Sequence, residues 1–210
     1  DIKNIKAVCS DAKDRGFQVN ENVLSRKFNA PSEKSQFVVL NETELDMIRE
    51  FHGADYLENA RDWLLIGCWT GCRFGDLMKL NMKNILPHKS GTKIIQYTQS
   101  KTGKLVSLPI HPHVKDIIER LNGFPRSISN VKFNKYIKEV CRHSKLTYQE
   151  SGTRQNPNTH LKELGSFEKW TLVKSHTCRR SFATNHYNKM NNKQIMAVTG
   201  HATERMLLDY

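Results

Sequence analysis

Two short motifs each put a basic side chain at the start of a predicted helix, where a phosphate would meet charge and free backbone donors. In HTCRRSFAT, His176 and Arg179 are three positions apart in a first helical turn, so both project from one face near the positive end of the helix dipole. In TGCRFGDL, Gly71 ends one helical pattern and Arg73 opens the next. Two such arginines make a phosphate clamp plausible. Considered separately, the first motif is more simply interpreted as a solvated helix face. The second is more simply interpreted as an ion pair between Arg73 and Asp76.

Three further residues supply groups for proton transfer and nucleophilic attack. Lys101 lies in the segment SKTG between two predicted strands, where a flexible ammonium can reach into a groove and donate a proton, and Lys104 across the turn competes for this role. In TGHATERMLLDY, His201 follows the Gly200 that ends a helical pattern, and Tyr210 stands nine positions later. The simpler interpretation of Lys101 and Lys104 is that they are solvated loop lysines. The simpler interpretation of Tyr210 is that its ring packs against the fold.

Together these side chains are the components of a metal-free phosphoryl transfer with a tyrosine nucleophile. A phenol with a pKa of about 10 attacks poorly, so its site must take the proton or stabilise the phenolate, and cations must stabilise the pentavalent phosphorus. Tyr210 is the candidate nucleophile and His176 the candidate base.

The charge of the chain favours a polyanionic partner. Its 210 residues contain 33 Lys and Arg against 21 Asp and Glu, a formal net charge of +12, and the pI is near 9.5. Nucleic acid is therefore the expected partner, although charge does not distinguish binding from cutting. No apolar stretch approaches the roughly 20 residues that span a bilayer, and no signal-peptide pattern precedes the first helix, so we expect no membrane partner. Because the sequence begins at Asp1 rather than Met, we expect a fragment.

The cysteines argue against a disulfide framework. There are five, an odd number without a paired CxxC, which is typical of a reducing compartment. Cys68 and Cys72 are four apart and Cys178 lies near His176, so a metal site is one interpretation. Buried helix cysteines are the favoured one, and we predict no metal.

Hydrophobic periodicity predicts an α+β chain that is mainly helical. Asn41 and Glu44 predict a capping box, and Ser175 is the predicted N-cap of a later helix. The segments KIIQYTQ and KLVSLPI predict a β-hairpin, a small antiparallel sheet on a helical core. The polar segment 146–170 is either a long loop or a second small strand pair. Helices are expected over residues 2–15, 41–51, 56–70, from about 73, 113–121, 130–144 and 175–190, then, after a turn at residues 191–192, up to residue 199, and in a short segment ending at 210.

Segment 17–36 carries Pro31 and has no sustained period, so it is interpreted as a linker in which a domain boundary falls. The expected organisation is residues 1–36 as one helix with an interdomain linker, and residues 37–210 as a second domain.

Taken in order, TGCRFGDLMKL, the hairpin lysine of SKTGKLVSLPI, SHTCRRSFAT, TGH and the tyrosine nine residues after that histidine resemble the catalytic domain of tyrosine recombinases (phage integrases). The resemblance spans roughly residues 38–210 and is greatest to integrases of conjugative transposons and prophages. It implies the tyrosine-recombinase catalytic fold, with the first helix and linker as the end of a core-binding domain.

The resemblance also implies a role for each residue. Arg73 and Arg179 are expected to hold the scissile phosphate, and Lys101 to protonate the 5′-hydroxyl leaving group. His176 is expected to transfer a proton at the tyrosine. The remaining roles are a phosphate hydrogen bond for His201, attack by Tyr210 to give a 3′-phosphotyrosyl enzyme, and DNA contact by Lys104 and Arg180, the last at a position that is often histidine in this family.

The implied partner is double-stranded DNA, bound by a tetramer at recombination sites, with a monomer when free. No metal or nucleotide cofactor is implied, and the expected location is the cytoplasm of a bacterium, at the nucleoid. Two alternatives stay open. A type IB topoisomerase uses a similar nucleophile and arginines but religates the original strands, and a DNA-binding regulator needs only the basic charge and the helices.

Overall fold

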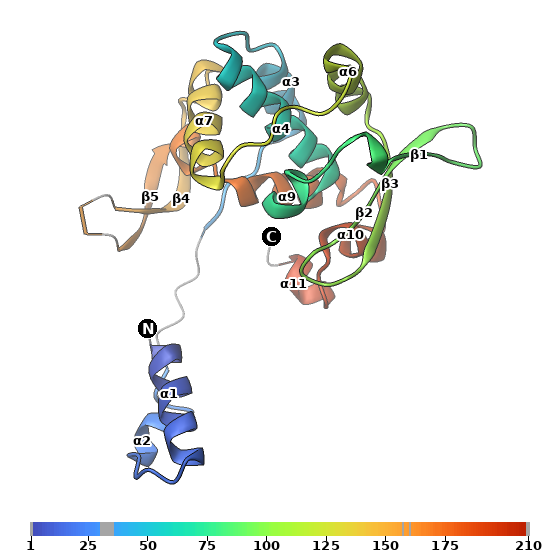
Figure 1. Ribbon diagram of the computed structural model, residues 1–210. Helices are drawn as coiled ribbons and strands as arrows, with labels where there is room; N and C mark the ends of the chain where they lie inside the picture. Colours follow the sequence, from blue (N-terminus) through green and yellow to red (C-terminus); the bar gives the residue numbers. More distant parts are fainter. Residues whose placement is uncertain (1, 30–35, 157, 160, 209–210) are drawn as a thin grey trace. The chain divides into compact units, whose positions relative to one another are not determined.

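The computed structural model describes residues 2–29, 36–156, 158–159 and 161–208, and the chain divides into two compact units, residues 1–35 and 36–210. The smaller unit holds α1 (Ile2–Asp14) and α2 (Glu21–Leu24) (Figure 1). The expectation of one helix followed only by linker is wrong for α2. This helix is four residues long, too short for a periodic pattern, and it begins because the Asn20 side chain accepts the amide of Asn22.

The larger unit is built around α4 (Asp55–Thr70), which packs against α3, α6, α7 and α9 (Figure 1). Every residue from Ala60 to Thr70 is buried, so α4 is buried on all sides rather than along the single predicted stripe. The surrounding helices are α3 (Glu42–Arg49), α5 (Phe74–Leu77), α6 (Pro112–Leu121), α7 (Asn130–His143), α8 (Lys169–Leu172), α9 (Ser175–His186), α10 (Asn192–Thr199) and α11 (Glu204–Leu208), with a 3-10 turn at Met82–Asn84.

Two small antiparallel sheets complete the larger unit. The predicted hairpin is confirmed as β2 (Lys93–Thr98) and β3 (Leu105–Pro109), with Tyr97 opposite Val106. A third strand, β1 (Ile85–Pro87), joins the free edge of β2 and was not predicted, because three residues carry no alternation signal. Segment 146–170 is the strand pair rather than the loop: β4 (Gln149–Gln155) pairs with β5 (Lys162–Glu168).

Helix α3 begins as its capping signal predicts, whereas both ends of α9 differ from the prediction. Asn41 and Glu44 form the predicted capping box of α3. The N-cap of α9 is Lys174 and not Ser175, since the extended Lys174 amide donates to the Thr177 hydroxyl at 3.0 Å. This helix ends at His186, earlier than the predicted residue 190.

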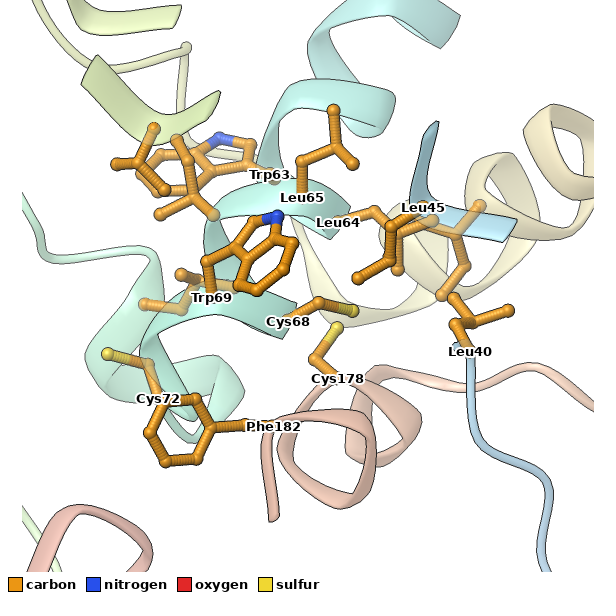
Figure 2. Packing of buried hydrophobic residues seen from close by; sticks show 14 of the residues in the cluster. Leu40, Leu45, Trp63, Leu64, Leu65, Cys68, Trp69, Cys72, Cys178 and Phe182 are labelled. Carbon is orange, nitrogen blue, oxygen red and sulfur yellow. The ribbon is translucent and has the colours of Figure 1, made fainter. Parts of the chain in front are cut away.

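One part of the core of the larger unit lies between α4 and α9 (Figure 2). Cys68 and Cys178 face each other there, both buried. A Cβ built on Gly67 would lie 3.0 Å from the Cys178 sulfur, so the two helices approach as closely as a glycine allows. Burial raises the pKa of the Cys68 thiol, consistent with a packing role.

In the described part of the chain, no three histidine, cysteine or acidic side chains gather as metal ligands would. None of the helices described is both long and apolar enough to cross a bilayer.

Candidate active site

Arg179 on α9 reaches the turn that follows α4. Its side chain is 2% exposed, and Nη1 donates a hydrogen bond to the Gly71 carbonyl at 2.8 Å. Gly71 ends α4 with a φ of +63°, which favours glycine, and a Cβ there would lie 2.9 Å from the Phe182 ring of α9. The tight turn therefore brings the TGCRFGDL and HTCRRSFAT motifs together in space.

Arg73 stands at the N-cap of α5 and is half-buried. Its Nη1 donates to Gln99 Oε1 at 2.8 Å. Arg73 takes part in none of the ion pairs between described residues, so the alternative of a pair with Asp76 is wrong. Asp76 is instead buried, and its Oδ1 accepts a hydrogen bond from the Ser100 amide at 3.0 Å in the hairpin turn. The guanidinium of Arg73 is thus held by a neutral amide.

Gln99, the residue directly after β2, is one that the sequence reasoning missed. It is 1% exposed, and its Nε2 donates to the Val198 carbonyl at 2.7 Å, near the end of α10. A signal was available in the strand pattern. Ile95, Tyr97 and Gln99 alternate on the buried face, so a polar side chain at the third position demands buried hydrogen-bond partners.

The two candidate lysines lie on the connection between β2 and β3, and both are exposed. The backbone N–H of Gln99 donates to the backbone carbonyl of Lys104 at 2.9 Å. This hydrogen bond closes the turn, and Lys101 lies within it. The turn is tied to the TGCRFGDL motif, because the Ser100 amide donates a hydrogen bond to Asp76. These contacts bring the turn to the motif and leave both lysines as candidates for the general acid.

His176 and His201 lie in the same positive environment. His176 keeps solvent access, yet desolvation by nearby protein atoms, followed by the charges of Arg180, Arg179, Arg73 and His201, lowers its pKa to about 4. Desolvation, then Arg179 and Arg73, also lowers the pKa of His201 to about 4. Both rings are therefore neutral at pH 7. Because Arg73 and Arg179 lower the pKa of each histidine, the four side chains form one cluster.

The His201 ring is held by Thr199. Nδ1 of His201 lies 2.9 Å from the Thr199 hydroxyl, which donates its own proton to the Ile195 carbonyl at 2.6 Å. We therefore assign Nδ1 as the donor to this hydroxyl, since a hydroxyl carries one proton. In the neutral ring Nε2 is then an acceptor, and the ring must take up a proton before Nε2 donates to an anion.

Arg180 points to a different neighbour. Its guanidinium lies 3.5 Å from the centre of the Phe37 ring. Both residues line a cavity of about 270 Å³ that is also bordered by Lys174 and His176. The backbone of Gln36 pairs with Thr153 of β4, because the Thr153 amide donates to the Gln36 carbonyl at 2.9 Å.

The predicted nucleophile, Tyr210, lies outside the described residues. The chain before it forms α11, whose Leu207 is 4% exposed and belongs to the core. Of the other predicted site residues, the structure brings Arg73, His176, Arg179 and His201 together, and it holds Arg180 beside His176 against Phe37.

Several solved structures share this fold at low sequence identity. A XerH site-specific recombinase in a post-cleavage complex with palindromic difH substrate has a TM-score of 0.58 and 16% identity, over 85% of this chain and 50% of that one. The Tn1549 transposon integrase with transposon right-end DNA has 0.57 and 14%, over 99% and 79%. A lambda integrase tetramer on a Holliday junction has 0.59 and 16%, over 96% and 58%.

The chain thus spans half the length of the XerH recombinase. No curated protein sequence matches it. Residues 39–210 match the model of the phage integrase family, which covers most of the chain and all of the predicted site residues. The chain therefore belongs to the phage integrase family.

Proposed function

We propose that this chain is the catalytic part of a site-specific DNA recombinase that integrates or excises a mobile element. The observation that carries the proposal is the convergence of Arg73 and Arg179 with two histidines that are neutral at pH 7. Such a cluster offers two positive charges to a phosphodiester and two rings that can accept or relay a proton. The fold shared with DNA-bound recombinases agrees with this assignment.

In the proposed reaction, Arg73 and Arg179 hold the non-bridging oxygens of the scissile phosphate. His176 accepts the phenol proton as the Tyr210 oxygen forms a bond to phosphorus. The bond from phosphorus to the 5′ oxygen breaks, and Lys101 donates a proton to that oxygen. The product is a 3′-phosphotyrosyl enzyme and a free 5′-hydroxyl, and attack by the 5′-hydroxyl of another strand reverses the step. No metal or nucleotide cofactor takes part.

His201 contributes a hydrogen bond to the phosphate once its ring is protonated. The negative charge of a bound phosphate offsets the two arginines that lower the His201 pKa in the free protein, so DNA binding favours the protonated ring.

The proposed partner is double-stranded DNA, with a tetramer at the recombination sites and a monomer in the absence of DNA. A net charge of +12 supports a phosphate-rich partner. Lys104 and Arg180 are the proposed additional DNA contacts. Residues 1–36 are proposed to be the end of a core-binding domain with its linker, and residues 37–210 the catalytic domain. The proposed location is the bacterial cytoplasm, at the nucleoid.

The test is incubation with a nicked suicide duplex that carries the end sequence of the element, scored for a covalent DNA adduct on a denaturing gel. The matched variant is Tyr210→Phe, which removes one oxygen and leaves the ring. An adduct that is absent from the variant supports the proposal. DNA binding without an adduct in the wild type contradicts it and favours a regulator.

The same substrates separate the topoisomerase alternative. A recombinase yields products in which strands of two duplexes are joined, whereas a topoisomerase restores the original strands. Lys101→Ala and Lys104→Ala identify the general acid. A substrate with sulfur in place of the bridging 5′ oxygen needs little protonation of its leaving group, so it should rescue only the variant that lacks the acid.

A further inference from the structure

We propose that Gln99 is a positioning residue that orients the Arg73 guanidinium toward the scissile phosphate. The inference rests on the proposed function, in which Arg73 holds that phosphate. The hydrogen bond from Arg73 Nη1 to Gln99 Oε1, at 2.8 Å, is the contact that fixes the guanidinium. Among the ion pairs between described residues, none involves Arg73.

The Gln99 amide is itself held in one orientation. Oε1 also accepts a hydrogen bond from the Thr102 hydroxyl at 2.8 Å, and Nε2 donates to the Val198 carbonyl at 2.7 Å. A buried amide with both polar atoms engaged has little freedom to rotate or to flip. Gln99 therefore joins three segments of the proposed site: the start of α5, the turn that carries Lys101, and the end of α10 just before His201.

Gly200 leaves the space that this arrangement needs. A Cβ on Gly200 would lie 2.4 Å from Gln99 Oε1 and 3.1 Å from Arg73 Nη2. The glycine in the TGH motif thus has two physical reasons, its φ of +62° and the close approach of the Gln99–Arg73 pair. A side chain at position 200 would displace the amide.

An amide suits this position better than a carboxylate. Glutamate at position 99 would pair with Arg73 and neutralise the charge that the phosphate needs, and its second oxygen would face the Val198 carbonyl, acceptor against acceptor. Gln99 orients the guanidinium while leaving its charge for the substrate.

The experiment measures the single-turnover rate of adduct formation on the nicked duplex, at saturating protein, for Gln99→Met and Gln99→Glu in the whole chain. The control is Gln96→Met, three residues earlier on β2, where the amide donates to Ser107 at 2.8 Å and lies outside the site. We expect Gln99→Met to slow the step about 10- to 100-fold. Gln99→Glu should be slower still, and Gln96→Met should match the wild type.

A double-mutant cycle tests whether Gln99 acts through Arg73. In the Arg73→Met background, Gln99→Met should change the rate by less than about threefold. A structural role would give the same loss in both backgrounds and would overturn the inference, as would a Gln99→Met rate equal to the wild type. Thermal melts check folding, and Thr102→Val, at an exposed site, provides a milder perturbation of the same amide. Failure of the wild type to form any adduct instead overturns the proposed function.

Discussion

Two arginines in this chain sit twelve positions apart and are held in opposite ways. Arg61 on α4 has a side chain that is 5% exposed and lies 2.9 Å from Asp62 Oδ1, with Glu58 at 3.7 Å. Arg120 binds the other oxygen of Asp62 at 2.7 Å. Arg73 instead donates to the neutral amide of Gln99.

The difference separates a structural ion pair from a candidate substrate site. A buried guanidinium with carboxylate partners has its charge balanced inside the fold, so it has little attraction left for an external anion. A guanidinium fixed by a neutral acceptor has no carboxylate beside it to balance its positive charge, so the charge stays available to an external anion. The type of partner, together with the deeper burial of Arg61, therefore distinguishes the arginine expected to stabilise the fold from the one expected to serve chemistry.

The largest expected effect comes from breaking the structural pair. Asp62→Ala leaves Arg61 and Arg120 without their shared carboxylate, and it should lower the free energy of unfolding by about 3–5 kcal/mol, because a buried charge loses its partner. Chemical denaturation measures this loss. A change below about 1 kcal/mol would mean that the Arg61 pair is not structural and would remove one side of the comparison.

Arg73→Met should give the reverse pattern. Loss of a charged donor to the phosphate should slow adduct formation about 10²- to 10³-fold, about 2.7–4 kcal/mol of barrier. The free energy of unfolding should change little, because Arg73 is half-buried and paired with no carboxylate in the described structure. Single-turnover kinetics and denaturation on the same samples provide the two readouts. Equal losses in rate and stability would contradict the distinction.

The pH dependence of stability tests whether the unbalanced charges of the candidate site hold His201 neutral. The folded-state pKa of His201 is about 4, below the ordinary value of about 6.5, so the unfolded chain binds more protons between these values. Stability should be complete above pH 6.5 and fall as the pH drops toward 4, with at most about 3 kcal/mol from this group. His201→Gln should make this fall shallower and leave the part that comes from His176, whose pKa is also lowered to about 4, as measured by denaturation at several pH values. An unchanged profile would show that His201 is not held neutral.

The smallest effect belongs to an exposed ion pair. Lys115 and Glu119 on α6 lie 3.7 Å apart, with side chains 64% and 63% exposed. Lys115→Met should lower the free energy of unfolding by no more than about 0.5 kcal/mol and should leave the adduct rate unchanged. A larger loss would mean that exposure is a poor guide to the worth of a pair in this protein.

Local signals account for the parts of the fold that the sequence predicts. The Asn41–Glu44 capping box, the glycine after α4 and the alternation of β2 and β3 each depend on neighbours in sequence. In contrast, α2 and β1 are too short for a periodic signal. The strand pair of 146–170 depends on a register between residues such as Gly152 and Gly165 that polar composition does not encode.

The site divides along the same line. The types and order of Arg73, His176, Arg179 and His201 are visible in the sequence, whereas their common environment is created by tertiary contacts. The role of Gln99 also depends on tertiary contacts, since its partners Arg73 and Val198 are 26 and 99 positions away in the sequence. The correction at Asp76 has the same origin, because its partner Ser100 lies on the hairpin.

The close approach of α4 and α9 at Gly67 has a consequence for mutational tolerance. A methyl group there would press on Cys178, which immediately precedes Arg179. A wedge at this point would spread the two helices and draw the Arg179 side chain away from the carbonyl that anchors it. In a screen for loss of activity, substitutions of Gly67, which has no reactive group, would then be found together with substitutions of the reactive residues. The site is sensitive to substitution as far out as the packing that sets the distance between its helices.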